Sequence, residues 1–144
     1  MTDYSFRRPE SVLVVVYTVD HQCLLLKRVS PPDFWQSVTG TLAWGEEPAD
    51  AAARELREET GLAPLGLHDA GITRSFPILA EWRSRYSPQV DENVEHLWYL
   101  KIQAPLDITL NDAEHTAYRW LPLGVAIDTV ASWTNREALE RLRE

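Results

Sequence analysis

The chain has 144 residues, one cysteine and a formal net charge of −8. This length suits one domain with a real core, so we expect residues 1–144 to form a single domain. The acidic balance argues against non-specific nucleic-acid binding, and no stretch approaches the roughly 20 apolar residues of a membrane span. Lone Cys23 cannot form an internal disulfide, which favours a cytoplasmic protein.

Three segments in the first part of the chain have the composition of strands. Residues 11–19 and 23–28 are almost continuously apolar, which is typical of strands buried on both faces. Residues 34–42 predict an extended segment that contains Gly40.

A helix is expected over residues 48–60. Pro48 suits the first helical position, and Gly61 suits a left-handed C-terminal cap. On a helical wheel, one face collects the small and aliphatic side chains that we expect to pack on a sheet: Ala49, Ala52, Ala53 and Leu56. A second face collects three acids at spacings i, i+3 and i+4: Glu55, Glu58 and Glu59.

The second half of the chain predicts further strands and a terminal helix. The strands are expected at residues 66–79, 93–103, 107–110 and 118–121. Residues 81–93 are polar and predict a long loop, and Thr134 with Glu137 fits a capping box at the start of the last helix. The pattern indicates an α/β or α+β protein in which helices pack on a mixed sheet.

The acidic helix has two interpretations. The crowded carboxylates are either a solvated charged face or a site for a hard divalent cation such as Mg²⁺, which takes carboxylate oxygens, water and phosphate oxygens as ligands. The surrounding sequence decides between them. From Gly40 to Leu62 it resembles the Nudix box, G-x5-E-x7-R-E-U-x-E-E-x-G-U with U aliphatic, at all nine defined positions.

This resemblance implies a mixed sheet sandwiched between helices, and hydrolysis of a nucleoside diphosphate linked to another group. It implies Mg²⁺ as cofactor, with Mn²⁺ as the alternative. It assigns the three helix acids, Glu55, Glu58 and Glu59, as metal-binding or base carboxylates. Glu46 and Arg54 would support the loop and helix, and Gly40 and Gly61 would permit tight turns. One further acid found in many such boxes is replaced by Ala43.

Segments outside the box resemble one branch of that family, the bacterial dihydroneopterin triphosphate pyrophosphohydrolases of folate biosynthesis. They include RRPESVLVVVY, DFWQSVTG, EHTAYRWL and SWTNREALE. The resemblance implies cleavage between the α and β phosphates and makes Glu114 a metal ligand. It implies substrate contacts from Arg7, Arg28, Thr39, Phe76, Pro77, Ile78, Leu79 and Ser132.

Three other functions stay open at this point. A nucleotide-pool sanitising enzyme would use the same box on a nucleoside triphosphate. A catalytically silent binding module would usually lack box glutamates, and none is missing here. An interaction protein would use the acidic helix to dock a basic partner. The sequence leaves the oligomeric state and the identity of the general base open.

Overall fold

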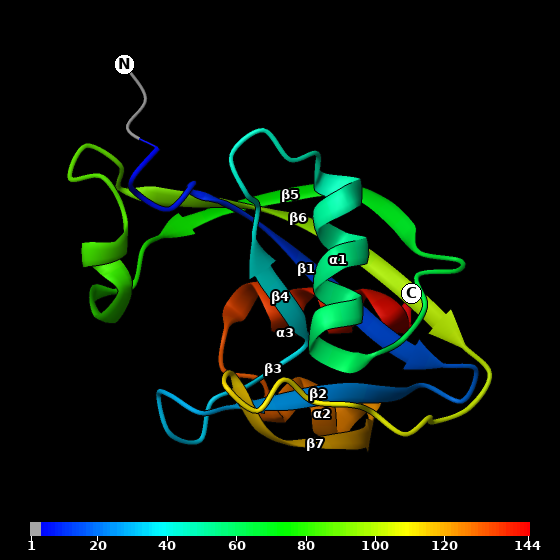
Figure 1. Ribbon diagram of the computed structural model, residues 1–144. Helices are drawn as coiled ribbons and strands as arrows, with labels where there is room; N and C mark the ends of the chain where they lie inside the picture. Colours follow the sequence, from blue (N-terminus) through cyan, green and yellow to red (C-terminus); the bar gives the residue numbers. More distant parts are fainter. Residues whose placement is uncertain (1–3) are drawn as a thin grey trace.

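The computed structural model describes residues 4–144. Within this range one seven-stranded sheet is covered by helices on both faces (Figure 1). Helix α1 (Pro48–Thr60) lies on one face, and α2 (Leu123–Thr129) and α3 (Trp133–Glu140) lie on the other. The predicted sheet between helices is therefore confirmed. None of the described helices combines the length and apolar character needed to cross a membrane.

The sheet is mixed. Its strands in chain order are β1 (Glu10–Thr18), β2 (Gln22–Arg28), β3 (Trp35–Gln36), β4 (Val38–Thr41), β5 (His68–Pro77), β6 (Glu92–Ile102) and β7 (His115–Pro122). The spatial order is β3-β2-β1-β6-β5, while β4 also pairs with β1 and β7 with β2. The β1–β6 pair is parallel, and every other pair is antiparallel.

Strand β1 is buried on both faces, as its sequence predicts. Val12, Val14 and Val16 belong to the apolar cluster under α1, whereas Leu13 and Val15 belong to the cluster under α2 and α3. Successive side chains of a strand point to opposite faces, so a continuously apolar strand joins the two cores.

Helix α1 has the predicted bounds, and Gly61 caps it with φ 75° while its N–H donates to the carbonyl of Arg57. The predicted packing face is partly wrong, because Ala49 is exposed and Ala51 is buried instead. The buried stripe also includes two of the acids, and its members are Ala51, Ala52, Glu55, Leu56, Glu59 and Thr60. The three acids therefore do not form one common outward face.

Two expectations for the second half of the chain are wrong. Residues 107–110 form no strand; instead the N–H of Thr109 donates to the carbonyl of Thr60 and fastens this segment to the end of α1. Residues 81–93 are not all loop, since the 3₁₀-helix η1 (Ala80–Arg85) precedes β6.

The C-terminal region also differs from expectation. Helix α2 was not predicted, and a short 3₁₀-helix, η2 (Arg141–Arg143), follows α3. The cap of α3 is Ser132, whose Oγ accepts from the N–H of Asn135, so Thr134 lies inside the helix.

Candidate active site

Gly40 brings β4 into direct contact with α1. A Cβ atom at this position would collide with the carboxylate of Glu55. Gly40 lies inside a strand and has no left-handed φ, whereas Gly45 in the following loop has φ 82°. The expected tight turn at Gly40 is therefore wrong: this glycine permits a close approach, and the turn lies further along the loop.

Arg54 connects the loop to the helix. Its Nε and Nη2 donate to the two carboxylate oxygens of Glu46, each at 2.8 Å, and its Nη1 donates to Glu55 at 2.8 Å and Glu58 at 3.2 Å. Glu46 in turn accepts from the N–H of Ala43 at 2.9 Å. These charge-assisted bonds lower the pKa of Glu46 to about 2. The support role implied for Glu46 and Arg54 thus has a physical basis in a forked ion pair.

The three helix acids have different surroundings. Glu58 has a side chain 52% exposed, while Glu55 is buried beneath Gly40. Burial raises the pKa of Glu55 to about 7, although the charge of Arg54 opposes the shift. Glu55 and Glu58 share Arg54, and Glu59 does not contact it.

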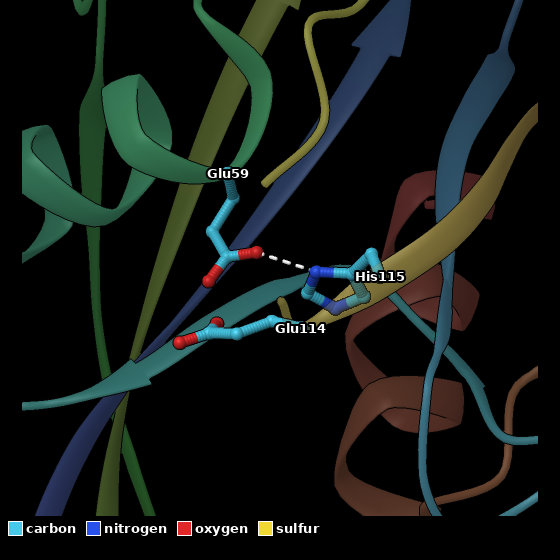
Figure 2. A group of neighbouring side chains, drawn as sticks. All are labelled: Glu59, Glu114 and His115. Carbon is cyan, nitrogen blue, oxygen red and sulfur yellow. Dashed lines mark ion pairs between the residues drawn. The ribbon is translucent and has the colours of Figure 1, made fainter. Parts of the chain in front are cut away.

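Glu59 faces a different part of the chain. Its side chain is 2% exposed and lies beside Glu114, from the turn before β7, and His115, the first residue of β7 (Figure 2). One ligand atom from each of the three lies within 4.8 Å of the others. The fold thus brings the Glu114 implied by resemblance to the last turn of α1.

His115 was missed by sequence reasoning. Its Nδ1 lies 2.6 Å from Oε2 of Glu59, and its Nε2 lies 3.1 Å from the side-chain nitrogen of Gln36. An amide N–H can only donate, so Nε2 is the acceptor and the ring proton sits on Nδ1. This nitrogen lies close to Glu59, but the two groups do not have hydrogen-bond geometry. Burial lowers the pKa of His115, which favours this neutral form. The only sequence signal was the adjacent position of His115 after Glu114.

Ionisation of both Glu59 and Glu114 is unfavourable without a cation. Burial and a hydrogen bond with Glu114 raise the pKa of Glu59, and the same bond lowers the pKa of Glu114. Two carboxylates so close keep one proton between them unless a metal ion replaces it. Glu59 Oε2 has no hydrogen-bond partner among residues 4–144, and the group offers two carboxylate oxygens beside one imidazole nitrogen. The two carboxylates are hard oxygen ligands and fit a divalent cation such as Mg²⁺.

One arginine, Arg28, lies close to the acids. Arg28 is half-buried, and its Nε donates to the carbonyl of Ser30 at 2.8 Å. Its guanidinium carbon lies 5.1 Å from the ring centre of Trp82 and 6.0 Å from that of Phe34. The charges of Glu114 and Glu59 act on this guanidinium. Aromatic packing therefore holds Arg28 beside the acidic centre.

The other residues that the resemblance implies as substrate contacts form no hydrogen bond or ion pair with the acidic centre within the described part of the chain, and two of them already have structural roles. The hydroxyl of Thr39 donates to the carbonyl of Val12 at 2.8 Å, so its proton is already used inside the sheet. Ser132 has the structural role of capping α3. Phe76 is half-buried at the end of β5, while Pro77 and Leu79 are exposed. Ile78 is also half-buried, and Arg7 is exposed.

The sequence and the structure were compared with those of known proteins. The NUDIX domain family model matches residues 7–142. The dihydroneopterin triphosphate diphosphatase of Escherichia coli K12 is 40% identical, with 98% of this chain and 96% of that protein covered. That of Haemophilus influenzae is 34% identical, with 94% and 88% covered. The solved structure of the E. coli dihydroneopterin triphosphate pyrophosphohydrolase superposes with a TM-score of 0.87 at 39% identity, covering 94% of this chain and 95% of that one.

Proposed function

We propose, from the premise that this chain belongs to the NUDIX family, that it hydrolyses dihydroneopterin triphosphate to dihydroneopterin monophosphate and pyrophosphate. The observation that carries the chemistry is the meeting of Glu59 with Glu114 at the end of α1, with Arg28 beside them. The observation that favours this substrate is 40% identity, over nearly the whole chain, to the dihydroneopterin triphosphate diphosphatase of E. coli K12.

Different residues of the chain are assigned to metal binding, carboxylate positioning, phosphate binding and proton transfer. Glu55, Glu59 and Glu114 would hold Mg²⁺, which supplies Lewis-acid polarisation of phosphate oxygens when bound. The His115 ring, with Nδ1 2.6 Å from Oε2 of Glu59, limits the positions that this carboxylate can take. Arg28 is placed to donate to phosphate oxygens, because a guanidinium fork matches two of them. Glu58 is the solvent-facing acid of the helix and is available to take a proton from water.

The test is a substrate panel in which pyrophosphate and orthophosphate are detected separately. Dihydroneopterin triphosphate should give a higher kcat/KM than any ordinary nucleoside triphosphate, with pyrophosphate released intact. Release of orthophosphate from the γ position would contradict the proposed bond cleavage.

The same panel addresses the other functions. A higher kcat/KM with an oxidised nucleoside triphosphate would instead indicate a nucleotide-pool sanitising enzyme. Absence of turnover with every triphosphate, in the presence of either Mg²⁺ or Mn²⁺, would indicate a binding module.

A further inference from the structure

A hollow of about 510 Å³ lies between the N-terminal segment, the loop after β4 and the end of η1. Its lining includes Phe6, Arg7, Arg8, Ala43, Trp44 and Arg85. Thr41, next to Gly40, also lines it, so the hollow adjoins the strand that contacts Glu55. Three of the lining residues are arginines, so the hollow is locally basic although the chain has a net charge of −8.

The three arginines are not equivalent. Arg8 is occupied, because it forms an ion pair with Glu10 at 2.8 Å and donates to the carbonyls of Ala43 and Glu46. The guanidinium groups of Arg7 and Arg85 are exposed, and neither has a hydrogen-bonded or ion-paired partner among residues 4–144. Arg8 therefore supports the loop, whereas Arg7 and Arg85 are available to a ligand.

The backbone keeps these two cations adjacent. The N–H of Arg7 donates to the carbonyl of Arg85 at 2.9 Å, which ties the N-terminal segment to the end of η1. The same short helix carries Trp82, whose ring packs on Arg28. The positive charges of Arg85 and Arg7 both act on Arg28, so all three surround one region next to Glu59 and Glu114.

The charge distribution indicates what this region binds. An acidic metal centre attracts a cation but repels the outer phosphates of a triphosphate, which stay anionic beyond the metal. A pair of unpartnered guanidinium forks beside that centre offsets the repulsion and matches phosphate oxygens in geometry.

We propose that Arg85, together with Arg7, binds the terminal two phosphates of the substrate, which become the pyrophosphate product. The assignment of these phosphates as the leaving group rests on the proposed function; the anion-binding role of Arg85 does not. Arg85 was not singled out by the sequence, because it lies in a segment that looked like an ordinary polar loop.

The experiment measures binding of inorganic pyrophosphate with Mg²⁺ to the full chain by titration calorimetry. Arg85→Met should weaken this binding by roughly 10- to 100-fold, the range expected for losing hydrogen bonds to a charged group. Lys101→Met is the control, since it removes one positive charge from the exposed far end of β6. Thermal unfolding should give the same Tm for Arg85→Met and wild type, because the Arg85 side chain makes no hydrogen bond to any of residues 4–144.

The outcomes separate this inference from the proposed function. Equal pyrophosphate affinity in wild type and Arg85→Met would overturn the role of Arg85, whatever the enzyme hydrolyses. An equal loss of affinity in Lys101→Met would also overturn it, because the effect would then be general electrostatics. A specific loss in Arg85→Met supports it, even if dihydroneopterin triphosphate fails as a substrate in the panel above.

Discussion

Single carboxylates in this protein differ because their neighbours differ. Glu58 and Glu59 are adjacent in sequence, yet Glu58 is solvated and paired with Arg54, whereas Glu59 is buried against Glu114 and His115. Successive helix residues point about 100° apart, so one faces solvent while the other faces the turn before β7. The chemistry at the site therefore depends on individual residues, and Glu114 is the residue that the helix cannot supply.

Glu114→Gln should raise the Mg²⁺ concentration needed for half-maximal activity by at least about tenfold, and should also lower kcat. An amide is a weaker ligand than a carboxylate, and it cannot offset the charge of an ion bound at Glu59. Titrating activity against Mg²⁺ checks this.

Asp112→Asn is the matched control for that experiment. Asp112 is an exposed acid in the same turn as Glu114. Its substitution should change neither the Mg²⁺ requirement nor kcat. If both variants titrate like wild type, Glu114 does not belong to the metal site.

At the scale of elements, the contact between α1 and β4 places the helix acids. The small side chains Ala51 and Ala52 let the helix lie close to the sheet, and Gly40 removes the last obstacle beside Glu55. Arg54 then fixes the loop between the two elements through Glu46. The Arg54–Glu46 ion pair thus joins the loop to the helix, and an added methyl group at Gly40 would disturb their packing.

Gly40→Ala should lower both stability and activity. The new methyl group would overlap the Glu55 carboxylate, and overpacking of this kind costs about 1–3 kcal/mol. The free energy of unfolding in urea and the Mg²⁺ dependence of turnover measure the two effects.

Gly124→Ala controls for the substitution itself. Gly124 lies in α2, and the nearest atom to an added Cβ is a flexible arginine tip 4.0 Å away. Alanine in a helix should leave stability unchanged or improve it by up to about 1 kcal/mol. Wild-type stability and activity in Gly40→Ala would show that the Glu55 carboxylate or β4 can shift at little cost.

At the scale of the whole molecule, the sheet separates two interiors of different character. The α1 side contains the acidic centre. The α3 side contains a buried acid outside that centre, Glu95 on β6, which is 7% exposed. Burial raises the pKa of Glu95 to about 7, against the opposing effects of a hydrogen bond from Thr134 and the charge of Arg74. The folded protein therefore binds this proton more tightly than the unfolded chain does.

Glu95→Gln should stabilise the protein at pH 8 but not at pH 5. Because the folded pKa lies above the value of 4.5 for an exposed glutamate, the wild type loses stability as pH rises from about 4.5 to 7. The glutamine has no such loss, so the difference should reach about 2–3 kcal/mol at pH 8.

Urea unfolding of wild type and variant at both pH values measures the difference directly. Glu92→Gln, an exposed position on the same strand, should show no change with pH relative to wild type. A Glu95→Gln difference that is constant between pH 5 and pH 8 would mean that Glu95 stays ionised when folded.

The sequence by itself determined the local features of this protein. The bounds of α1, its cap at Gly61 and the double burial of β1 follow from preferences that act over a few residues, and the spacing from Gly40 to Leu62 identified the family. These features can be predicted from the sequence because proline, glycine and apolar periodicity constrain the backbone wherever they occur.

Only the tertiary structure decided which residues meet. Glu59 contacts His115, and Arg85 lies beside Arg7, because the sheet order brings together segments that are far apart in the chain. The same cause explains the wrong strand at residues 107–110, whose backbone bonds to the end of α1 instead of to a neighbouring strand. Local preferences cannot specify such partners, since a hydrogen bond or ion pair across the fold depends on how every intervening element packs.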